Sequence, residues 1–432
     1  MTVELSGAAP EVFDSRITTD VVELVGSGRL RRLGIEFGQG WLTPRESSDG
    51  VGIDVEHEVG ARASVRIRPG RRVRIELTVE SIVEDVITVH GPVMWVRGEN
   101  EPISWHAGAT AEIVLPSEHG PGLLTQRRGI STPGGEPGMS YPLDEELSLR
   151  PRQAMSAAWT YEAFPGGLLD VPAEPGWLPL VRHVPTGRAV EISAPDGLVQ
   201  LVGDGTVEDV DGEFEVYPPE GLTAMEVWGP SGRTLVEVGA YEDLAVLRRR
   251  LVEEQGSDDV WAYVAARSLA EGPFSDGVLD RIDWALGAYE DEPTAWSVCA
   301  SLLASHVGLP LTEQAQRGAA EVLSRGGVDD ALLLALHGLA PAELLTGGWP
   351  IGDFGQRGLE ALARLSYGRI HTDGRRERGR DVAVARLYAA GLGETERGLH
   401  AAACAQGAEG RLMCLLTTRP DPLDLAWLSV GA

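Results

Sequence analysis

Residues that could exchange protons and hold a sugar gather in one stretch of the chain, from Val86 to Gly129. Within it His106 and Glu112 are six residues apart, so that one continuous strand would place both on the same face, and they are close in sequence to Trp95 and Trp105. A histidine and a carboxylate could exchange protons with a hydroxyl or a hemiacetal, and an exposed indole can stack on a sugar ring. We therefore predict His106 and Glu112 as catalytic residues and both tryptophans as substrate-binding residues. The alternative is that both indoles belong to the core.

A second candidate site is the sequence TGGWPIGDFG, residues 346–355, which we expect to be a loop between two helices. The loops that join stacked helical hairpins lie along one edge of such a domain, and ligands often bind at loops of this kind. We predict Trp349 as a substrate-binding residue and Asp353 as a catalytic residue, unless Trp349 simply packs in a rigid turn. The acidic run Glu290–Glu292 is another rim candidate, although such runs are more often solvated loops.

Every basic side chain apart from histidine is an arginine, because the sequence contains no lysine. This excludes a phosphate-loop lysine, a kinase-type lysine and Schiff-base chemistry. Two of the arginines, Arg127 and Arg128, are adjacent in GPGLLTQRRG. Two guanidinium groups suit the oxygens of a uronate or a phosphate, so we predict that this pair binds substrate. Otherwise it pairs with carboxylates of the chain itself.

Common cofactor and metal motifs are absent from the sequence. His57-Glu58 lacks the second histidine of a metalloprotease helix, and no Gly-x-Ser-x-Gly motif occurs. Gly26–Gly28 lacks the third glycine of a dinucleotide loop. Three cysteines show no metal-binding spacing and are expected to be reduced core residues: Cys299, Cys404 and Cys414. We therefore expect neither a metal nor a cofactor.

Composition and charge exclude several classes of partner. The formal net charge of −28 repels phosphate backbones and anionic lipid, so nucleic acid and membrane surfaces are not expected partners. The first residues lack a basic start followed by an apolar run, and no later segment is apolar enough to span a membrane. We expect a cytoplasmic protein. A length of 432 residues predicts about two to three domains.

Residues 1–165 alternate between apolar and polar side chains, in runs separated by Gly, Pro and Asp. In RVRIELTV, for example, Val73, Ile75, Leu77 and Val79 share one parity. This pattern is typical of strands with one face on a core and one face toward water. We predict an antiparallel β-sandwich. Residues 166–240 then form a Pro- and Gly-rich strap and a small β unit, which is either separate or closes the same sandwich.

From residue 241 to residue 432 the apolar period changes from two to 3.6, which predicts an all-α domain. Leu244, Leu247 and Leu251 form the first helix face, and Pro293-Thr294 marks a helix start. Short helices joined by tight loops imply stacked hairpins, as an α/α superhelix or a partial toroid. The later helices are expected at 312–325, 329–339, 354–367, 380–390, 394–406 and 409–416.

The domain order, together with VMWVRGENEPISWHAG and GPGLLTQRRG, resembles carbohydrate-active proteins with a galactose-mutarotase-like β-supersandwich followed by an α/α-helical domain. The resemblance implies a glycan or sugar ligand and a glycoside hydrolase-like or mutarotase-like activity. The alternative is a non-catalytic scaffold that holds a protein partner on its helical superhelix. No acid and base of the family can be placed on this helical half, and no residue specifies a substrate.

Overall fold

A computed structural model describes most of the chain between Thr2 and Val430. The ranges left out are 6–10, 18–20, 27–28, 48–51, 69–71, 100–101, 108–109, 118–119, 130–131, 134–137, 168–178, 195–196, 230–231, 255, 270–276 and 341–378. The helix expected at 354–367 lies outside the described residues.

The N-terminal part consists of antiparallel strands, as the alternating pattern predicts. Their bounds are β1 (Thr2–Leu5), β2 (Glu11–Ile17), β3 (Val21–Gly26), β4 (Leu30–Glu36), β5 (Arg45–Glu46), β6 (Gly52–Glu56), β7 (Ala61–Arg68), β8 (Val73–Ser81), β9 (Ile87–His90), β10 (Val93–Gly98), β11 (Ile103–Ala107), β12 (Thr110–Leu115), β13 (Gly122–Arg128), β14 (Thr132–Pro133), β15 (Met139–Tyr141), β16 (Glu146–Leu149) and β17 (Ala154–Ala163).

Most of these strands form two large sheets that share one core, and β9 and β16 form a separate two-stranded sheet. One sheet has the order β1-β2-β3-β4-β10-β15-β14, and the other has the order β11-β12-β13-β17-β8-β7-β6-β5. Side chains such as Leu33 and Met94 from the first sheet belong to the same buried cluster as Leu77 and Trp159 from the second. Two sheets that face one another across a shared apolar layer form a sandwich. The predicted fold class is therefore confirmed for this part of the chain.

Strand β8 shows why the sequence folds in this way. Its side chains alternate between buried and more exposed, with Val73, Ile75, Leu77 and Val79 all buried. Successive side chains of a strand point to opposite faces, so this alternation places one face of the sheet on the core.

A second β unit follows, with its own buried cluster. It contains a four-stranded sheet, β18-β24-β23-β20, and a three-stranded sheet, β19-β22-β21. The predicted strands of this unit are present, but the domain boundaries near residues 165 and 240 stay a prediction. The bounds are β18 (His183–Pro185), β19 (Val190–Ser193), β20 (Leu198–Val202), β21 (Thr206–Val210), β22 (Glu213–Tyr217), β23 (Gly221–Gly229) and β24 (Gly232–Tyr241).

The rest of the described chain is helical, which confirms the change of period near residue 241. The helix predicted at 312–325 has those bounds in the structure. The bounds are α1 (Leu244–Glu253), α2 (Asp259–Leu269), α3 (Val278–Gly287), α4 (Ala295–His306), α5 (Thr312–Arg325), α6 (Val328–Leu336), α9 (Gly379–Gly391), α10 (Glu396–Thr418) and α11 (Pro422–Leu428).

Helix α10 is one continuous helix where the sequence predicted two. The expected break fell between residues 406 and 409, close to Gly407 and Gly410. Both glycines instead allow α10 to pack closely against the backbone of β18 and of the residues just before it. A Cβ at Gly407 would lie 2.7 Å from the Leu180 carbonyl oxygen, and one at Gly410 would lie 2.7 Å from the His183 carbonyl oxygen. Helix α11 was not expected.

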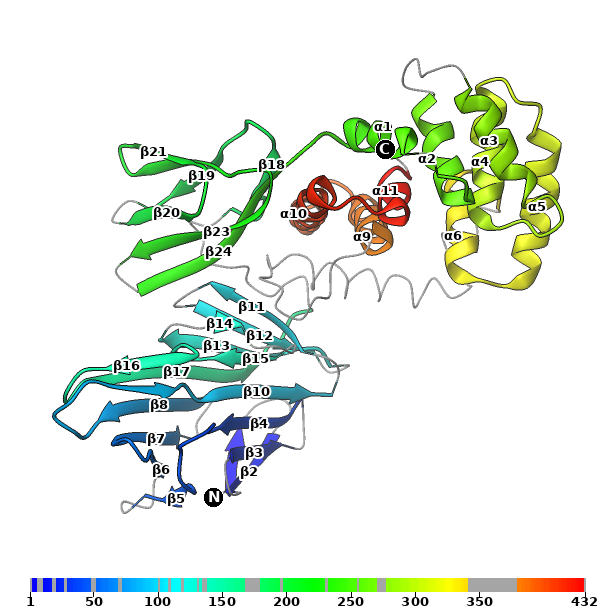
Figure 1. The fold of residues 1–432 in the computed structure, drawn as a ribbon. Coiled ribbons are helices and arrows are strands. Elements are labelled where there is room, and N and C mark those ends of the chain that lie inside the picture. Colours follow the sequence, from blue (N-terminus) through cyan, green and yellow to red (C-terminus); the bar gives the residue numbers. More distant parts are fainter. Residues whose placement is uncertain are drawn as a thin grey trace.

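The helices and the second β unit form a continuous arrangement (Figure 1). Helix α10 contacts β18, β23 and β24 on one side and α9 on the other, and α11 connects α9 to α2. Helix α1 lies beside α10 and α11, and helices α2 to α6 lie beyond them. The N-terminal sandwich meets the second β unit through β11 and β24. Within the residues described, no helix is both long and apolar enough to cross a membrane.

Candidate functional site

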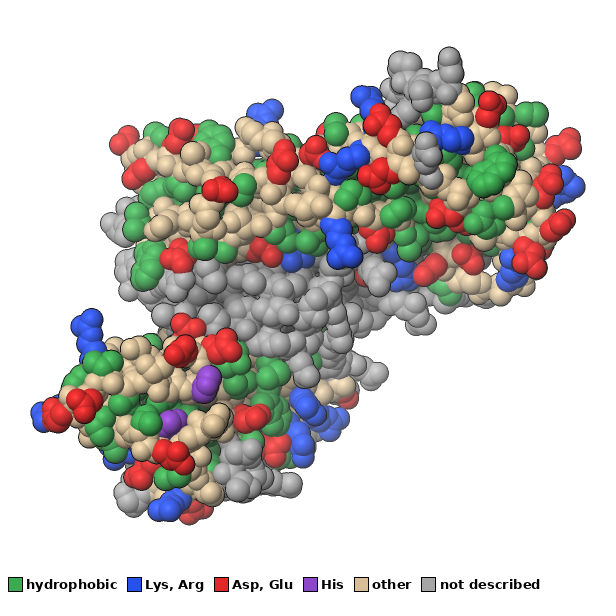
Figure 2. Space-filling model, viewed as in Figure 1, with side chains coloured by type: hydrophobic (Ala, Val, Ile, Leu, Met, Phe, Trp, Pro, Cys, Tyr) green, Lys and Arg blue, Asp and Glu red, His purple; other side chains and the backbone are tan. Residues whose placement is uncertain are grey.

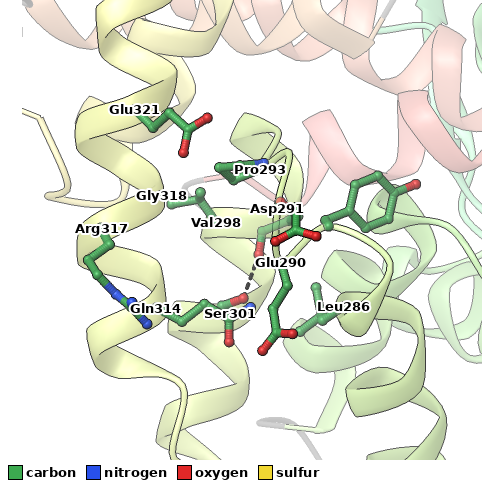
Figure 3. A pocket seen from close by; sticks show the side chains of 12 residues that line it. Leu286, Glu290, Asp291, Pro293, Val298, Ser301, Gln314, Arg317, Gly318 and Glu321 are labelled. Carbon is green, nitrogen blue, oxygen red and sulfur yellow. Dashed lines mark hydrogen bonds between the residues drawn. The ribbon is translucent and has the colours of Figure 1, made fainter.

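A polar pocket of about 330 Å³ lies between the end of α3, the loop 288–294, and helices α4 and α5 (Figure 3). The loop carries the acidic run Glu290–Glu292 that the sequence analysis noted as a rim candidate. Twelve residues line the pocket: Leu286, Tyr289, Glu290, Asp291, Pro293, Ser297, Val298, Ser301, Gln314, Arg317, Gly318 and Glu321.

The pocket loop is fixed on one side by the start of α4. Thr294 caps this helix: its Oγ1 accepts a hydrogen bond from the Ser297 amide at 3.0 Å, and Ser297 Oγ accepts one from the Thr294 amide at 2.9 Å. This reciprocal pair is a capping box. Thr294 Oγ1 also donates to the Asp259 carboxylate at the start of α2. The predicted helix start at Pro293-Thr294 is confirmed, and it ties the loop to two helices.

Helix α5 fixes the loop from the opposite side. Arg325 Nη1 donates to the Pro293 carbonyl oxygen at 2.8 Å, and its Nη2 lies 2.6 Å from Glu321 Oε1. Gly318 permits close contact, because a Cβ there would lie 2.7 Å from Val298 Cγ2. These contacts anchor the backbone of the loop at Pro293 and Thr294 from both sides.

Four polar side chains on the pocket wall have no hydrogen-bond or ion-pair partner within the described part of the chain. Glu290 and Asp291 come from the loop, and Gln314 and Arg317 come from α5 (Figure 3). Acceptors and donors therefore face the pocket from different elements. Carboxylates accept hydrogen bonds, whereas guanidinium and amide groups donate them. This set matches a ligand that carries several hydroxyl groups.

The inner wall of the pocket is formed by small and apolar side chains. Ser301 is buried, and its Oγ donates to the Ser297 carbonyl oxygen at 2.8 Å. Val298 and Leu286 are also buried. Tyr289 stands at the edge, where burial, reinforced by the nearby Asp259 carboxylate, raises the pKa of its hydroxyl. The tyrosine is thus neutral and able to donate a hydrogen bond at neutral pH.

The predicted residues His106 and Glu112 lie on two neighbouring strands rather than on one. Strands β11 and β12 form a hairpin in which Trp105 pairs with Glu112 and His106 pairs with Ala111. The expectation of a single continuous strand through both residues is therefore wrong, because β11 and β12 are antiparallel. The catalytic roles of His106 and Glu112 stay predictions.

The same ladder connects Glu112 to the predicted arginine pair. Glu112 pairs with Thr125, and Thr125 pairs with Thr160. Arg127 Nε donates to Thr160 Oγ1 at 2.9 Å. Trp105, Glu112 and the arginine pair therefore lie along one region of the eight-stranded sheet, with Arg128 exposed on β13.

Trp95 lies on β10 of one sheet, whereas Trp105 lies on β11 of the other. Trp95 is half-buried against Gly34, and the Arg97 guanidinium lies 5.5 Å from its ring centroid. Trp349 and Asp353 lie outside the described residues. The roles assigned to these residues, and those of His106, Glu112, Arg127 and Arg128, stay predictions.

Sequence reasoning missed a pair of titratable residues inside the helical half. Tyr263 Oη lies 3.1 Å from His337 Nε2, and the Trp296 ring packs edge-on against Tyr263. Burial, with the nearby Arg267, lowers the pKa of His337 to about 4. Burial also raises the pKa of Tyr263. Both groups are therefore neutral at pH 7. Tyr263 is fully buried, which makes it part of the core rather than of the pocket.

A buried charged cluster at the boundary between the second β unit and α10 was also missed. It consists of His183, Glu237 and Arg411, which come from β18, β24 and α10. No local pattern could have indicated it, because the partners are distant in sequence. Within the described residues, no group of three or more His, Cys, Asp or Glu side chains is arranged to hold a metal ion.

No family model and no curated protein sequence matches the chain. One solved structure, described as a polysaccharide lyase, has a similar fold, with a TM-score of 0.54 and 10% sequence identity. The match covers 92% of this chain and 82% of that chain. An M1 zinc metallopeptidase mutant from Deinococcus radiodurans reaches a TM-score of only 0.13 at 12% identity, over 78% of this chain and 90% of the other. That second likeness carries no argument.

Proposed function

We propose that the protein is carbohydrate-active and that the pocket between loop 288–294 and α5 holds a sugar. The proposal depends on four polar side chains of the pocket wall that have no hydrogen-bond or ion-pair partner within the described residues. Glu290 and Asp291 face Gln314 and Arg317 across the pocket. The fold likeness to a polysaccharide lyase supports it, because that match extends over nearly the whole chain.

The composition of the lining suits a sugar. Each hydroxyl of a pyranose can both donate and accept, so it is satisfied by a wall that offers carboxylates beside a guanidinium and an amide. Val298 and Leu286 provide apolar surface for the C–H groups of the ring. Specific sites commonly combine such apolar surface with a few fixed polar groups.

The two loop carboxylates are also the proposed proton-transfer groups. Glu290 and Asp291 are exposed and not neutralised by an ion pair within the described residues. A carboxylate within hydrogen-bond reach of a sugar oxygen can act as a general base or, when protonated, as a general acid. His106, Glu112 and Asp353 remain proposed alternatives. The arginine pair, Trp95, Trp105 and Trp349 remain proposed sugar contacts elsewhere.

The test is titration of the full chain with a panel of neutral, amino and acidic oligosaccharides by isothermal calorimetry, together with assays for new reducing ends and for unsaturated products. We expect binding of at least one member, and about a tenfold loss of affinity for Arg317→Ala and for Glu290→Gln/Asp291→Asn, because each removes charge-assisted hydrogen bonds.

Matched surface variants control for the change in charge. Arg249 on α1 and Asp283 on α3 are exposed and do not line the pocket. Arg249→Ala and Asp283→Asn should leave binding unchanged. Failure of every saccharide to bind would overturn the proposal. Binding that the pocket variants leave intact would move the sugar site elsewhere. The scaffold alternative stays a prediction, and capture of a protein partner by the helical half would support it.

A further inference from the structure

The pocket wall carries more negative than positive charges when side chains that form ion pairs within the protein are left out. Glu321 is neutralised by Arg325, which also holds the loop. Two carboxylates, Glu290 and Asp291, then face one guanidinium, that of Arg317. The wall therefore carries a surplus of one negative charge.

The opposite charges on the pocket wall come from different elements. Glu290 and Asp291 come from a loop tied to α2 and α4 through Thr294. Arg317 comes from α5, across the pocket (Figure 3). No ion pair joins the two sides within the described residues. A ligand that fills the space can satisfy both sides, with a cationic group at the loop and oxygen atoms at α5.

The surroundings strengthen the preference for a cation. The chain carries a net charge of −28, and Figure 2 shows acidic side chains distributed widely over the helical part, with arginines among them. The net negative charge of the pocket wall and of the whole protein raises the local concentration of cationic ligands. A carboxylate or sulfate on the sugar would meet like charge at Glu290 and Asp291.

From this juxtaposition we infer that the pocket selects a saccharide with a free amine, an amino sugar, over neutral and acidic sugars. The inference rests on the proposed function. The ammonium group binds at Glu290 and Asp291, and ring hydroxyls bind at Gln314 and Arg317. Hydrogen bonds between charged partners are stronger than neutral ones, so the free amine, and not the ring alone, sets the affinity.

The experiment compares four tetrasaccharides by calorimetry, at a pH below the pKa of the sugar amine. The probes are β-1,4-linked glucosamine, its N-acetylated form, the matching glucose tetramer and a glucuronate tetramer. We expect the glucosamine tetramer to bind about tenfold more tightly than the N-acetylated form. The difference should shrink in high salt, because exposed charges are screened.

A charge-matched pair of variants separates the pocket from general attraction to an acidic protein. Glu290→Gln/Asp291→Asn and Glu253→Gln/Asp283→Asn remove the same net charge, but only the first changes the pocket. The first should abolish the preference for the amine, and the second should keep it.

Three outcomes would overturn the inference in distinguishable ways. Equal or tighter pocket-dependent binding of the glucose or glucuronate tetramer would overturn the amino-sugar selectivity and leave the proposed function standing. An equal loss in both double variants would show non-specific charge attraction and overturn it as well. If no tetramer binds and no member of the wider saccharide panel binds, the inference and the proposed function are both overturned.

Discussion

Glu237 on β24 and Arg411 on α10 form a two-point ion pair inside the protein. Arg411 Nε lies 2.5 Å from Glu237 Oε1, and its Nη2 lies 3.1 Å from Oε2. Only 8% of Glu237 and 4% of Arg411 is exposed. His183 Nε2 lies 3.5 Å from the same carboxylate. The second β unit is therefore joined to the helices by a buried charged contact as well as by apolar packing.

Removing the arginine should be strongly destabilising. Arg411→Ala leaves the Glu237 carboxylate buried without its main cation, and the loss of one partner of a buried pair costs about 3–5 kcal/mol. Urea unfolding should show a drop of this size in the free energy of unfolding. Arg249→Ala, on the exposed surface of α1, should change it by less than about 0.5 kcal/mol. A loss below about 1 kcal/mol for Arg411→Ala would contradict the role of the pair.

His183 should make the protein less stable in mild acid. Burial lowers its pKa below the ordinary value of 6.5, Arg182 and Arg411 act in the same direction, and Glu237 opposes them. The unfolded chain therefore binds a proton below pH 6.5 that the folded chain does not. Stability is present above that pH and falls as pH drops, by up to about 1.4 kcal/mol per pH unit.

Glu237 acts at lower pH. Burial by itself would raise its pKa, but His183 and Arg411 hold the pKa below the ordinary 4.5, so its stabilising contribution is lost only as pH falls through that lower value. Between pH 6.5 and 5 the effect of His183 is therefore separate from that of Glu237, and it adds to that of His337, whose pKa is also lowered by burial. His183→Gln should show a smaller fall in melting temperature over this interval than the natural chain. Parallel curves would rule out this histidine as the source.

Gly34 should be required for the position of the Trp95 ring. A Cβ on Gly34 would lie 2.3 Å from two ring atoms of Trp95, so Gly34→Ala must displace the indole. We expect a cost of about 1–3 kcal/mol, as for other overpacked sites, and a shift in tryptophan fluorescence. Gly38→Ala is the matched control, since nothing lies within 4 Å of its Cβ position. Equal behaviour of the two variants would show that the Trp95 ring is free to move.

Loss of the α4 cap should weaken sugar binding without removing a polar group of the pocket wall. Thr294→Ala removes the hydrogen bonds that tie the loop to α4 and α2, and a lost cap costs about 1 kcal/mol. Calorimetry should then show weaker binding of whichever saccharide the natural chain binds. Thr294→Ser should retain most of it.

A cap of the same kind elsewhere separates this effect from general destabilisation. Thr395 caps α10 through the Gly398 amide at 3.0 Å, away from the pocket residues. Thr395→Ala should reduce stability to a similar degree and leave saccharide affinity unchanged. If both caps affect binding equally, the pocket loop has no special role.

The regular parts of the fold were predictable because they follow from side-chain period. The alternation in β8 and the 3.6 period of α5 each arise from neighbouring residues on one element, so a single sequence contains the whole signal. The prediction of one helix break near Gly407 was wrong because a glycine that disfavours a helix also permits close contact, and only the packing of α10 on Leu180 shows which effect prevails.

The candidate site was predictable only in part. The run Glu290–Glu292 was noted in the sequence, yet its charges alone are typical of a solvated loop. Gln314 and Arg317, which complete the pocket, belong to the next helix, and their position depends on how α5 packs. The expectation that His106 and Glu112 lie on one continuous strand was wrong, because β11 and β12 are two antiparallel strands. Contacts such as that of Glu237 with Arg411 join distant segments, and no local pattern encodes them.

Strands β18 and β24 run parallel and side by side, with His183 beside Gly239 and Pro185 beside Tyr241. The chain thus enters and leaves the second β unit at nearly the same point. Insertions or deletions between β18 and β24 need not change the distance between the segments before and after the unit. Domains whose two ends lie close together tolerate insertion and exchange of this kind. Changes in β19 to β22 need not alter the path of the chain before His183 and after Tyr241, whereas β18, β23 and β24 are constrained by their contacts with α10.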